Sequence, residues 1–250
     1  MKKIKATFLG TNGWYDTKTG NTICILIECP DYYIVLDAGN GFGKLDRYID
    51  QNKPVYIFLS HFHLDHIIGL HTLAKFRFKQ KLNIIGQRGT RNILNVFMNW
   101  PFTLPRKDLP FKSEIIEVPK GLNKLPFKAE VLPMLHASPT LGIRLEIGGK
   151  TITYCPDTGF CENAVILSKN ADLLITECAF TIDFKVKNWP HLNHETAAEI
   201  AKESRAKKLI LTHFDAGIYP DFKSRNKAGS IAGKIFHKTI VSRDGMKIEI

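Results

Sequence analysis

Short runs of apolar residues recur along this chain and predict a protein rich in β-strands. Runs of a few residues that are apolar throughout, or that alternate apolar and polar positions, are typical of strands. They cover residues 4–9, 22–28, 32–36, 55–59, 82–85, 113–118, 127–132, 141–147, 151–154, 173–176, 208–211, 239–242 and 246–250. Gly148-Gly149 and Asp244-Gly245 each lie between two runs and predict two-residue hairpin turns.

Helical patterns are fewer and predict helices over residues 64–76, 90–100, 162–168 and 196–204. Thr196 and Glu199 fit a capping box, so the last helix is expected to begin at Thr196, with its free amide groups facing His194. No repeat and no Gly/Ser linker divides the chain. We therefore expect one domain over residues 1–250.

The composition, with 44% hydrophobic residues, is sufficient for a substantial core. Residues 1–10 have no continuous apolar stretch and predict a strand rather than a signal peptide. No apolar run approaches the roughly 20 residues of a membrane helix, so a soluble, cytoplasmic protein without membrane contact is expected. The five cysteines lack paired spacing, which excludes a disulfide framework; Cys155 and Cys161 are either buried or part of a site.

Positive charge dominates, with 35 basic against 24 acidic residues and a net charge of +11. This balance points to a polyanionic partner or a negatively charged substrate. No acidic residue occurs between Asp65 and Asp108, where the chain carries Lys75, Arg77, Lys79, Lys81, Arg88, Arg91, Arg106 and Lys107. We interpret this basic segment either as a binding surface for a polyanion or as a solvated face.

The sequence His61-Phe62-His63-Leu64-Asp65-His66 contains four candidate metal ligands directly after an apolar run. A catalytic zinc ion usually takes three protein ligands and keeps one position open. Four ligands so close together therefore indicate two metal ions. In an extended segment His61 and His63 point to the same side, and a helix beginning after His63 would carry Asp65 and His66 toward a second position.

Three further candidates, His136, Asp157 and His213, each follow an apolar run. Residues at strand ends can converge at one edge of a layered fold. The economical division of the seven side chains gives each metal three ligands, with Asp157 bridging both. The first set is His61, His63 and His136, and the second is Asp65, His66 and His213.

These residues, in this order, resemble the metallo-β-lactamase superfamily. Its signature His-x-His-x-Asp-His is matched by His61, His63, Asp65 and His66, and its later ligands are matched by His136, Asp157 and His213. The resemblance extends over the whole chain, from Phe8-Leu9-Gly10-Thr11 and Leu36-Asp37-Ala38-Gly39 to the closing strands. It implies an α+β fold, a four-layer αββα sandwich with a dinuclear site, usually zinc, at one edge.

Within the superfamily the chain is most similar to the ribonuclease Z branch. That branch carries a His-Ser-Thr motif before a helix and a Glu-Ala-Thr-Phe-like motif at a strand end, which His194-Glu195-Thr196 and Glu177-Cys178-Ala179-Phe180 resemble. The resemblance implies that His194 contacts the scissile phosphate or its leaving oxygen and that Glu177 orients His194. A helix amino terminus also favours a phosphate. His191 has no assigned chemistry.

Ribonuclease Z enzymes that process transfer RNA carry a long arm between the positions of His136 and Asp157, which here are only 21 positions apart. The missing arm favours a compact phosphodiesterase, similar to the small cyclic-phosphate-cleaving enzymes of the superfamily. The expected substrate is an RNA end, a cyclic phosphate or a nucleotide.

The expected cofactors are two divalent metal ions, zinc first, with manganese or iron as alternatives. A metal-bridging hydroxide is the expected nucleophile. Asp65, His194 and Glu177 form the expected catalytic set, in which His194 stabilises or protonates the leaving oxygen.

Two other functions remain open. A thioester or lactone hydrolase would use the same metals without needing His194 or the basic segment, and a non-catalytic nucleic-acid-binding protein would use the fold as a scaffold. β-Lactam hydrolysis is disfavoured because Asp65 beside His66 departs from the triple-histidine arrangement of lactamases. A homodimer stays open by analogy with the superfamily. Residues 98–111 form either a substrate lid or a packed loop.

Overall fold

Two seven-stranded sheets form the centre of the computed structural model, which describes residues 4–250 except the side chains of Leu122 and Lys124. The first sheet has the spatial order β16 (Lys247–Glu249), β1 (Lys5–Gly10), β3 (Cys24–Glu28), β4 (Tyr33–Leu36), β5 (Val55–Phe58), β6 (Leu82–Gly86) and β7 (Ser113–Glu117). The second has the order β15 (Thr239–Val241), β13 (Leu209–Thr212), β12 (Leu173–Glu177), β11 (Lys150–Cys155), β10 (Leu141–Ile147), β9 (Lys128–Pro133) and β8 (Gly121–Lys124). The short strands β2 (Asn12–Gly13) and β14 (Phe214–Asp215) pair in parallel beside them.

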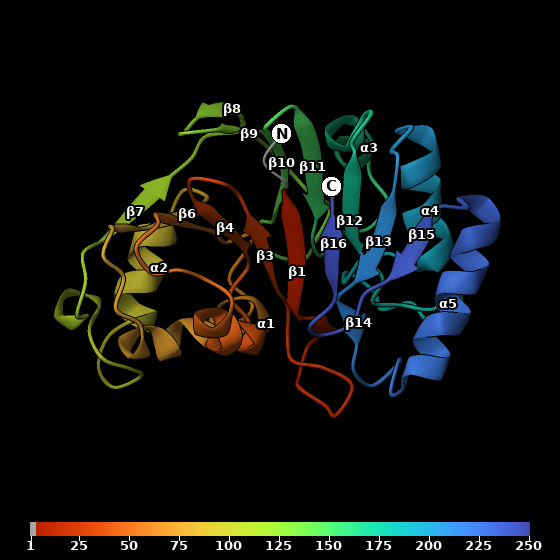
Figure 1. Cartoon of the computed structure of the whole chain (residues 1–250). Coiled ribbons are helices and arrows are strands. Elements are labelled where there is room, and N and C mark those ends of the chain that lie inside the picture. The colour runs from red at the N-terminus through yellow and green to blue at the C-terminus, as the bar shows by residue number, and fades with distance from the viewer. Residues whose placement is uncertain (1–3) are drawn as a thin grey trace.

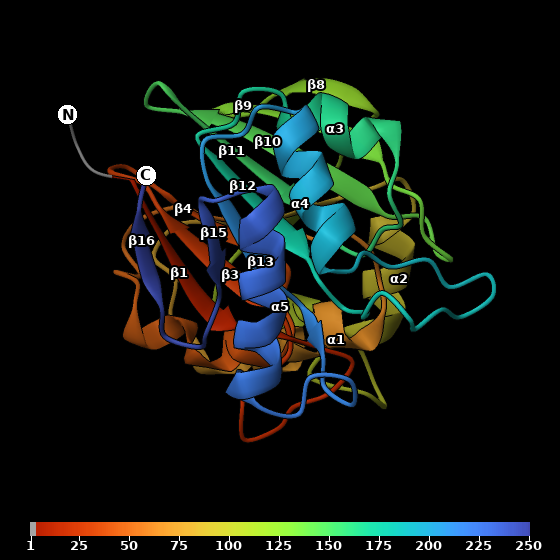
Figure 2. The ribbon, with the colours of Figure 1, turned by 90° about the vertical axis from the view of Figure 1, so that its right-hand side faces the viewer.

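Helices cover the outer faces of both sheets (Figure 1). Beside the first sheet lie α1 (Leu64–Ile67), α2 (Thr90–Phe97) and the 3-10 helices η1 (Asn40–Arg47), η2 (Ile68–Lys75) and η3 (Arg106–Asp108). The second sheet is covered by α3 (Glu162–Ser168), α4 (His194–Glu203) and α5 (Phe222–Ile235), which Figure 2 shows in front of its strands. The expected four-layer αββα sandwich is confirmed.

Three apolar cores hold the layers together. The central core, between the two sheets, includes Phe8, Ile34 and Tyr154. A second core lies between the first sheet and its helices, and a third between the second sheet and α3, α4 and α5. Strands β4 and β12 are buried along their whole length, which explains why they are apolar at successive positions and do not alternate.

The two predicted hairpin turns have different outcomes. Gly148 and Gly149, with φ angles of 55° and 77°, join β10 to β11 as a two-residue turn, and that prediction is confirmed. The prediction at Asp244-Gly245 is wrong, because β15 pairs with β13 and β16 pairs with β1 in the other sheet. The carboxylate of Asp244 accepts hydrogen bonds from Thr11 and the Lys44 ammonium. These contacts hold the link between β15 and β16 against the first sheet.

One helical prediction is wrong and one helix was not predicted, both for reasons of packing. The segment predicted as one helix over residues 64–76 becomes a 3-10 helix after Ile67, because Gly69 packs directly on the backbone and its amide donates to Ala38. A Cβ at Gly69 would lie 2.1 Å from the carbonyl oxygen of Gly39. Helix α5 was not predicted, since it is rich in polar residues and glycine and buries only small side chains and Arg225.

Helix α4 begins two residues earlier than predicted. Asn193, not Thr196, is the N-cap residue: its side chain accepts hydrogen bonds from the amides of Glu195 and Thr196, and the Thr196 hydroxyl accepts from the amide of Asn193. His194 is therefore the first residue inside the helix. The residues before Asn193 lie outside the helix, where they can reach the site.

Within residues 4–250, no helix is both long enough and apolar enough to cross a bilayer. The strand predicted for residues 1–10 is found as β1, and residues 1–3 of that prediction lie outside the described part of the chain.

Removing the cap of α4 should destabilise the protein. Asn193→Ala leaves two amides of the first turn without an acceptor, and we expect the free energy of unfolding to fall by about 1 kcal/mol. Urea unfolding at a fixed metal concentration measures the loss. Asn193→Asp keeps the acceptor oxygen and should stay close to the unchanged protein; equal losses in both variants would contradict the capping role.

Candidate metal centre and cavity

The seven predicted ligands meet where one strand of the first sheet and three strands of the second end. His61 and His63 follow β5, and the first turn of α1 carries Asp65 and His66. His136 follows β9, Asp157 follows β11, and His213 links β13 to β14 with a left-handed φ of 50°. Residues far apart in the sequence are thereby brought to one edge of the sandwich.

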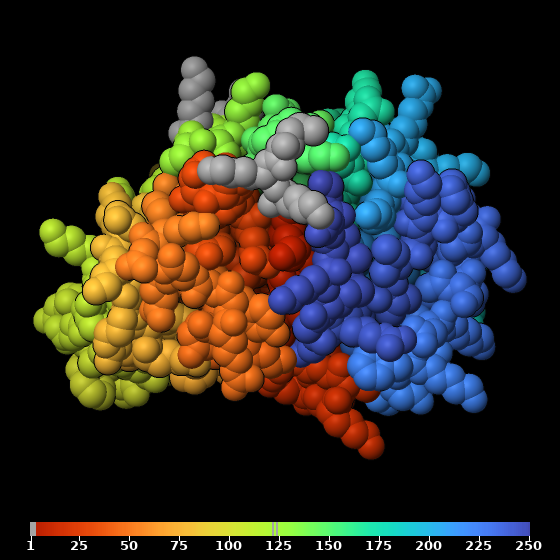
Figure 3. Space-filling view, in the orientation of Figure 1, coloured from red at the N-terminus to blue at the C-terminus, as the bar shows by residue number. Residues whose placement is uncertain are grey.

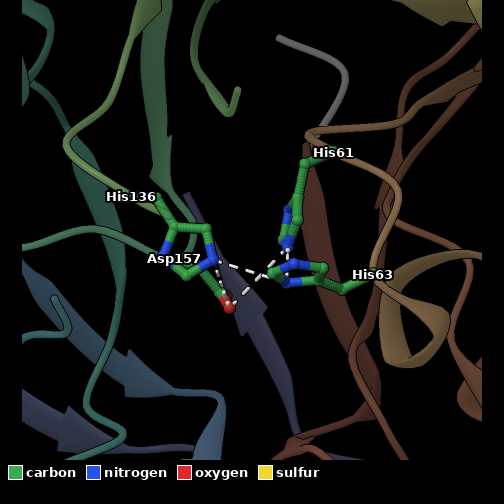
Figure 4. Close-up of side chains that lie close together, drawn as sticks. All are labelled: His61, His63, His136 and Asp157. Carbon is green, nitrogen blue, oxygen red and sulfur yellow. Dashed lines mark hydrogen bonds and ion pairs between the residues drawn. The ribbon is translucent and has the colours of Figure 1, made fainter. Parts of the chain in front are cut away.

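The first group of side chains consists of His61, His63, His136 and Asp157, whose ligand atoms all lie within 4.8 Å of one another. Figure 4 shows the three rings and the carboxylate turned toward a common space. Nδ1 of His63 lies 3.0 Å from Nε2 of His61 and 3.4 Å from Nε2 of His136. Two nitrogens bound to one tetrahedral zinc ion would be about 3.3 Å apart, so the spacing suits a shared ion.

The second group consists of Asp65, His66 and His213. Nε2 of His66 lies 3.1 Å from Nε2 of His213, and Nε2 of His213 lies 3.2 Å from Oδ2 of Asp65. Asp157 stands between the groups. Its Oδ1 is 3.2 Å from the ring nitrogens of His66 and His213, whereas its Oδ2 faces His61 and His136 at 3.8 Å.

The chemistry of this cluster fits two divalent cations. Asp157 is only 3% exposed, and its Oδ1 has no hydrogen-bond donor among the described residues. A buried carboxylate oxygen without a donor is costly unless positive charge compensates it. Burial raises the pKa of Asp157, but the surrounding histidines outweigh burial and hold it well below its ordinary value. The carboxylate of Asp157 is therefore ionised, which is the form that binds a cation.

Asp37, which received no role in the sequence analysis, orients His66 from beneath. Its Oδ2 accepts hydrogen bonds from Nδ1 of His66 at 2.8 Å and from the Tyr154 hydroxyl at 2.7 Å, and its other oxygen accepts from the amide of Ser60. This arrangement leaves Nε2 of His66 free as a ligand. A carboxylate that accepts the hydrogen of the other ring nitrogen is the usual second partner of a metal-binding histidine. The position of Asp37 directly after β4 was the available signal.

Gly13 and Trp14 hold the second group from the other side. A Cβ at Gly13 would lie 2.6 Å from the ring of His213, so only glycine lets the ring lie there. The backbone amide of Trp14 donates to Oδ2 of Asp65 at 2.8 Å. Trp14 itself has a left-handed φ of 71°, a conformation that non-glycine residues rarely adopt.

A cavity of about 710 Å³ opens beside both groups. Polar and ionisable side chains line its floor: His63, Asp65, Asp157, His191, His213 and Asp215. Apolar side chains line the rest: Trp14, Leu64, Phe180, Phe184, Val186 and Trp189. A cavity with ionisable groups at its base and apolar walls is typical of a small-molecule site.

Glu177 and His191 form a buried pair at this cavity. Oε1 of Glu177 accepts from Nδ1 of His191 at 2.7 Å and from the amide of Thr158, while Oε2 accepts from the amide of Ala179. Burial disfavours the charged form of His191, but the charge and hydrogen bond of Glu177 outweigh it and raise the pKa of His191 to about 9. The His191 ring lies 5.1 Å from that of His136.

The prediction that Glu177 orients His194 is wrong, because the partner of Glu177 is His191. His194 is the first residue of α4 and is not among the residues that line the cavity. Its Nδ1 has no hydrogen-bond partner in the described chain, and burial lowers its pKa. Asparagine is a favoured N-cap residue, and this was the available signal: a helix α4 capped by Asn193 contains His194 and leaves His191 in the preceding loop.

The basic segment does not reach the cavity, whose lining includes none of its eight lysines and arginines. Lys75 pairs with Asp46 and Lys81 with Glu114, while Arg91 and Arg106 donate to backbone carbonyls. Residues 98–111 are likewise absent from the lining. Cys155 is buried and Cys161 half-buried, and neither lines the cavity.

Comparison with known proteins identifies the family. Residues 32–214 match the model of the β-lactamase superfamily domain. The probable metallo-hydrolase YhfI of Bacillus subtilis is 26% identical over 234 residues, which cover 90% of this chain and 93% of YhfI. Its crystal structure superimposes over 100% of both chains with a TM-score of 0.81 and 24% identity.

Proteins named ribonuclease Z are also similar. The Methanosarcina acetivorans enzyme is 26% identical over 308 residues, covering 99% of this chain and 98% of its own length. Because this chain has only 250 residues, that relative carries insertions absent here. The crystal structure of the short form of human tRNase Z covers 98% of both chains with a TM-score of 0.76 and 24% identity. The chain belongs to the metallo-β-lactamase superfamily of hydrolytic enzymes.

Proposed function

We propose that this chain is a dinuclear metal-dependent phosphodiesterase. The observation that carries the proposal is the Glu177–His191 pair, which places a proton donor on the wall of the cavity beside both ligand groups. A diester needs such a donor, because its leaving alkoxide is a strong base. The relatives named ribonuclease Z support a phosphodiester substrate.

In the proposed centre His61, His63 and His136 would hold one ion, Asp65, His66 and His213 would hold the other, and Asp157 would be shared by both. Two divalent cations bound there would supply Lewis acidity toward the phosphoryl oxygens and would activate water at neutral pH. Zinc is the proposed metal, because imidazole-rich sites with few carboxylates suit it; manganese and iron are the alternatives.

His191 and Glu177 have different proposed roles in the reaction. Nδ1 of His191 donates to Glu177, so Nε2 is the nitrogen available to the substrate. We assign His191 the role of general acid toward the leaving oxygen, the role that the resemblance gave to His194. Glu177 is a positioning residue, since its carboxylate is occupied by His191 and two backbone amides.

Loss of the proposed acid should slow phosphodiester cleavage. We expect His191→Ala to lower kcat by about 100-fold or more for a phosphodiester with an alkoxide leaving group. Bis(p-nitrophenyl) phosphate should lose less, because its weakly basic p-nitrophenoxide depends less on protonation. His194→Ala is the matched control and should retain most activity.

The same assays with a lactone and a thioester separate the alternative hydrolase. Cleavage of those esters alone, unaffected by His191→Ala, would overturn the phosphodiesterase proposal. A larger loss in His194→Ala than in His191→Ala, with both variants folded, would return the acid role to His194.

The positioning role of Glu177 predicts a specific kinetic change. Glu177→Gln removes the charge that holds His191 protonated while keeping the side-chain shape, and we expect kcat to fall by about 10- to 100-fold. KM and bound metal should hardly change, because Glu177 is not among the proposed ligands. A variant that instead loses metal, or that raises only KM, would contradict a role through His191.

The bridging role of Asp157 predicts that both metals are lost together. We expect Asp157→Ala to bind neither ion at concentrations that saturate the unchanged protein, because each ligand group loses its shared carboxylate. Metal analysis after dialysis counts the ions per chain. Asp215→Asn, at a residue that lines the same cavity outside both groups, is the control. Retention of one ion at full affinity in Asp157→Ala would exclude bridging.

A further inference from the structure

Several large apolar side chains that line the cavity are exposed to solvent rather than packed in a core. Trp14 is 69% exposed, and Leu64, Phe184, Val186 and Trp189 are all exposed as well. They gather from both halves of the sandwich, Trp14 and Leu64 from segments after β1 and β5, and the others from the segment between β12 and α4. Clustered exposed apolar side chains around a cavity mark a binding surface.

Trp14 is held in place by its backbone rather than by its side chain. Its amide donates to the proposed ligand Asp65, and its φ of 71° fixes the chain in a conformation that costs energy for a residue with a side chain. The backbone therefore fixes the point beside the ligand groups from which the Trp14 side chain extends, and this side chain lines the cavity. Its ring meets Tyr15 edge-on at 5.1 Å.

Aromatic rings from the segment between β12 and α4 also line the cavity. The ring of Trp189 stacks on the imidazole of His63, with 5.1 Å between centroids and 10° between planes. Phe180 and Phe184 pack edge to face at 4.9 Å. Together with Trp14, these rings give the cavity flat, apolar surfaces rather than hydrogen-bonding groups.

The charge of the cavity limits the size of the substrate. Among the residues described, the lining contains three aspartates and no lysine or arginine. A polynucleotide carries one negative charge per nucleotide and is bound largely through lysine and arginine. Apart from the proposed metals, this cavity therefore offers no lysine or arginine to a second phosphate group.

We propose that Trp14 determines specificity, by stacking on a flat, uncharged ring carried by an ester substituent of a small phosphodiester. This inference rests on the proposed phosphodiesterase function and narrows its substrate class to singly charged diesters with an aryl or nucleobase substituent. The phosphate lies at the ligand groups, and the ring lies against Trp14.

Two uncleaved probes test the stacking directly. Methyl phenylphosphonate and methyl methylphosphonate carry the same single charge and differ only in the ring. Equilibrium binding to the metal-loaded protein should favour the phenyl compound by about tenfold, the strength typical of stacking on an aromatic side chain. In Trp14→Ala the two dissociation constants should agree within about twofold, while Trp14→Phe should keep most of the preference.

Trp100→Ala is the matched control, since Trp100 is 72% exposed and lies outside the cavity lining. It should keep the full preference for the ring. A phenyl preference that survives in Trp14→Ala, with metal content and circular dichroism unchanged, would overturn the proposal. So would an oligoribonucleotide that binds more tightly than the phenyl probe and is insensitive to Trp14→Ala.

Hydrolysis assays separate this inference from the proposed function. If the protein cleaves bis(p-nitrophenyl) phosphate but Trp14→Ala leaves the ring preference intact, the phosphodiesterase proposal stands and the role of Trp14 falls. If Trp14 controls the ring preference but only lactones or thioesters are cleaved, the phosphodiesterase proposal and the diester substrate class fall, and only the stacking on Trp14 stands. Replacing the phenyl probe by a nucleoside methylphosphonate then distinguishes a nucleobase from a simple aryl group.

Discussion

The buried carboxylate of Asp157 is the constraint on which the functional end of this fold depends. A carboxylate withdrawn from water is stable only where positive charge or hydrogen-bond donors surround it. Its two oxygens face histidines of different ligand groups, which arise from both sheets. The ends of β5, β9, β11 and β13 must therefore meet at one place. A slip of one residue in any of these strands would turn its ligand to the other face.

The same constraint explains which parts of the site could be predicted from the sequence. His61, His63, Asp65 and His66 are close in sequence, and the later candidates each follow an apolar run, so their convergence needed only strands that end together. Asp37 and Gly13 act through contacts made by the packed chain, and residue type alone did not indicate them. The choice between His191 and His194 depended on one helix boundary, and such boundaries are the least certain part of a sequence pattern.

In the fold, too, the elements marked by a local sequence pattern were predictable, and those that depend on tertiary contacts were not. Strands were predictable because the faces of both sheets are covered, which requires continuous apolar runs such as β4 and β12. Helix α5 was not predicted because it packs closely through the small residues Ala228, Gly229 and Ala232. A Cβ at Gly229 would lie 2.3 Å from the side chain of Val241. Small residues at a close contact leave no apolar periodicity to detect. The pairing of β16 with β1 was not predicted because it joins the two ends of the chain; Asp244, just before β16, likewise has partners at least 200 positions away.

The ligand groups alone do not determine which bond this protein cleaves. A pair of divalent cations with activated water attacks a phosphodiester, a lactone or a thioester by the same electrostatic principle. Selectivity must then arise from groups that distinguish the leaving atom and the substituents. Glu177 and His191 supply a proton that a basic leaving oxygen needs and a thiolate does not. The apolar walls with Trp14 accept a ring but give no cation to a second phosphate. Under the proposed function, these two features together favour a small diester over both a thioester and a polynucleotide.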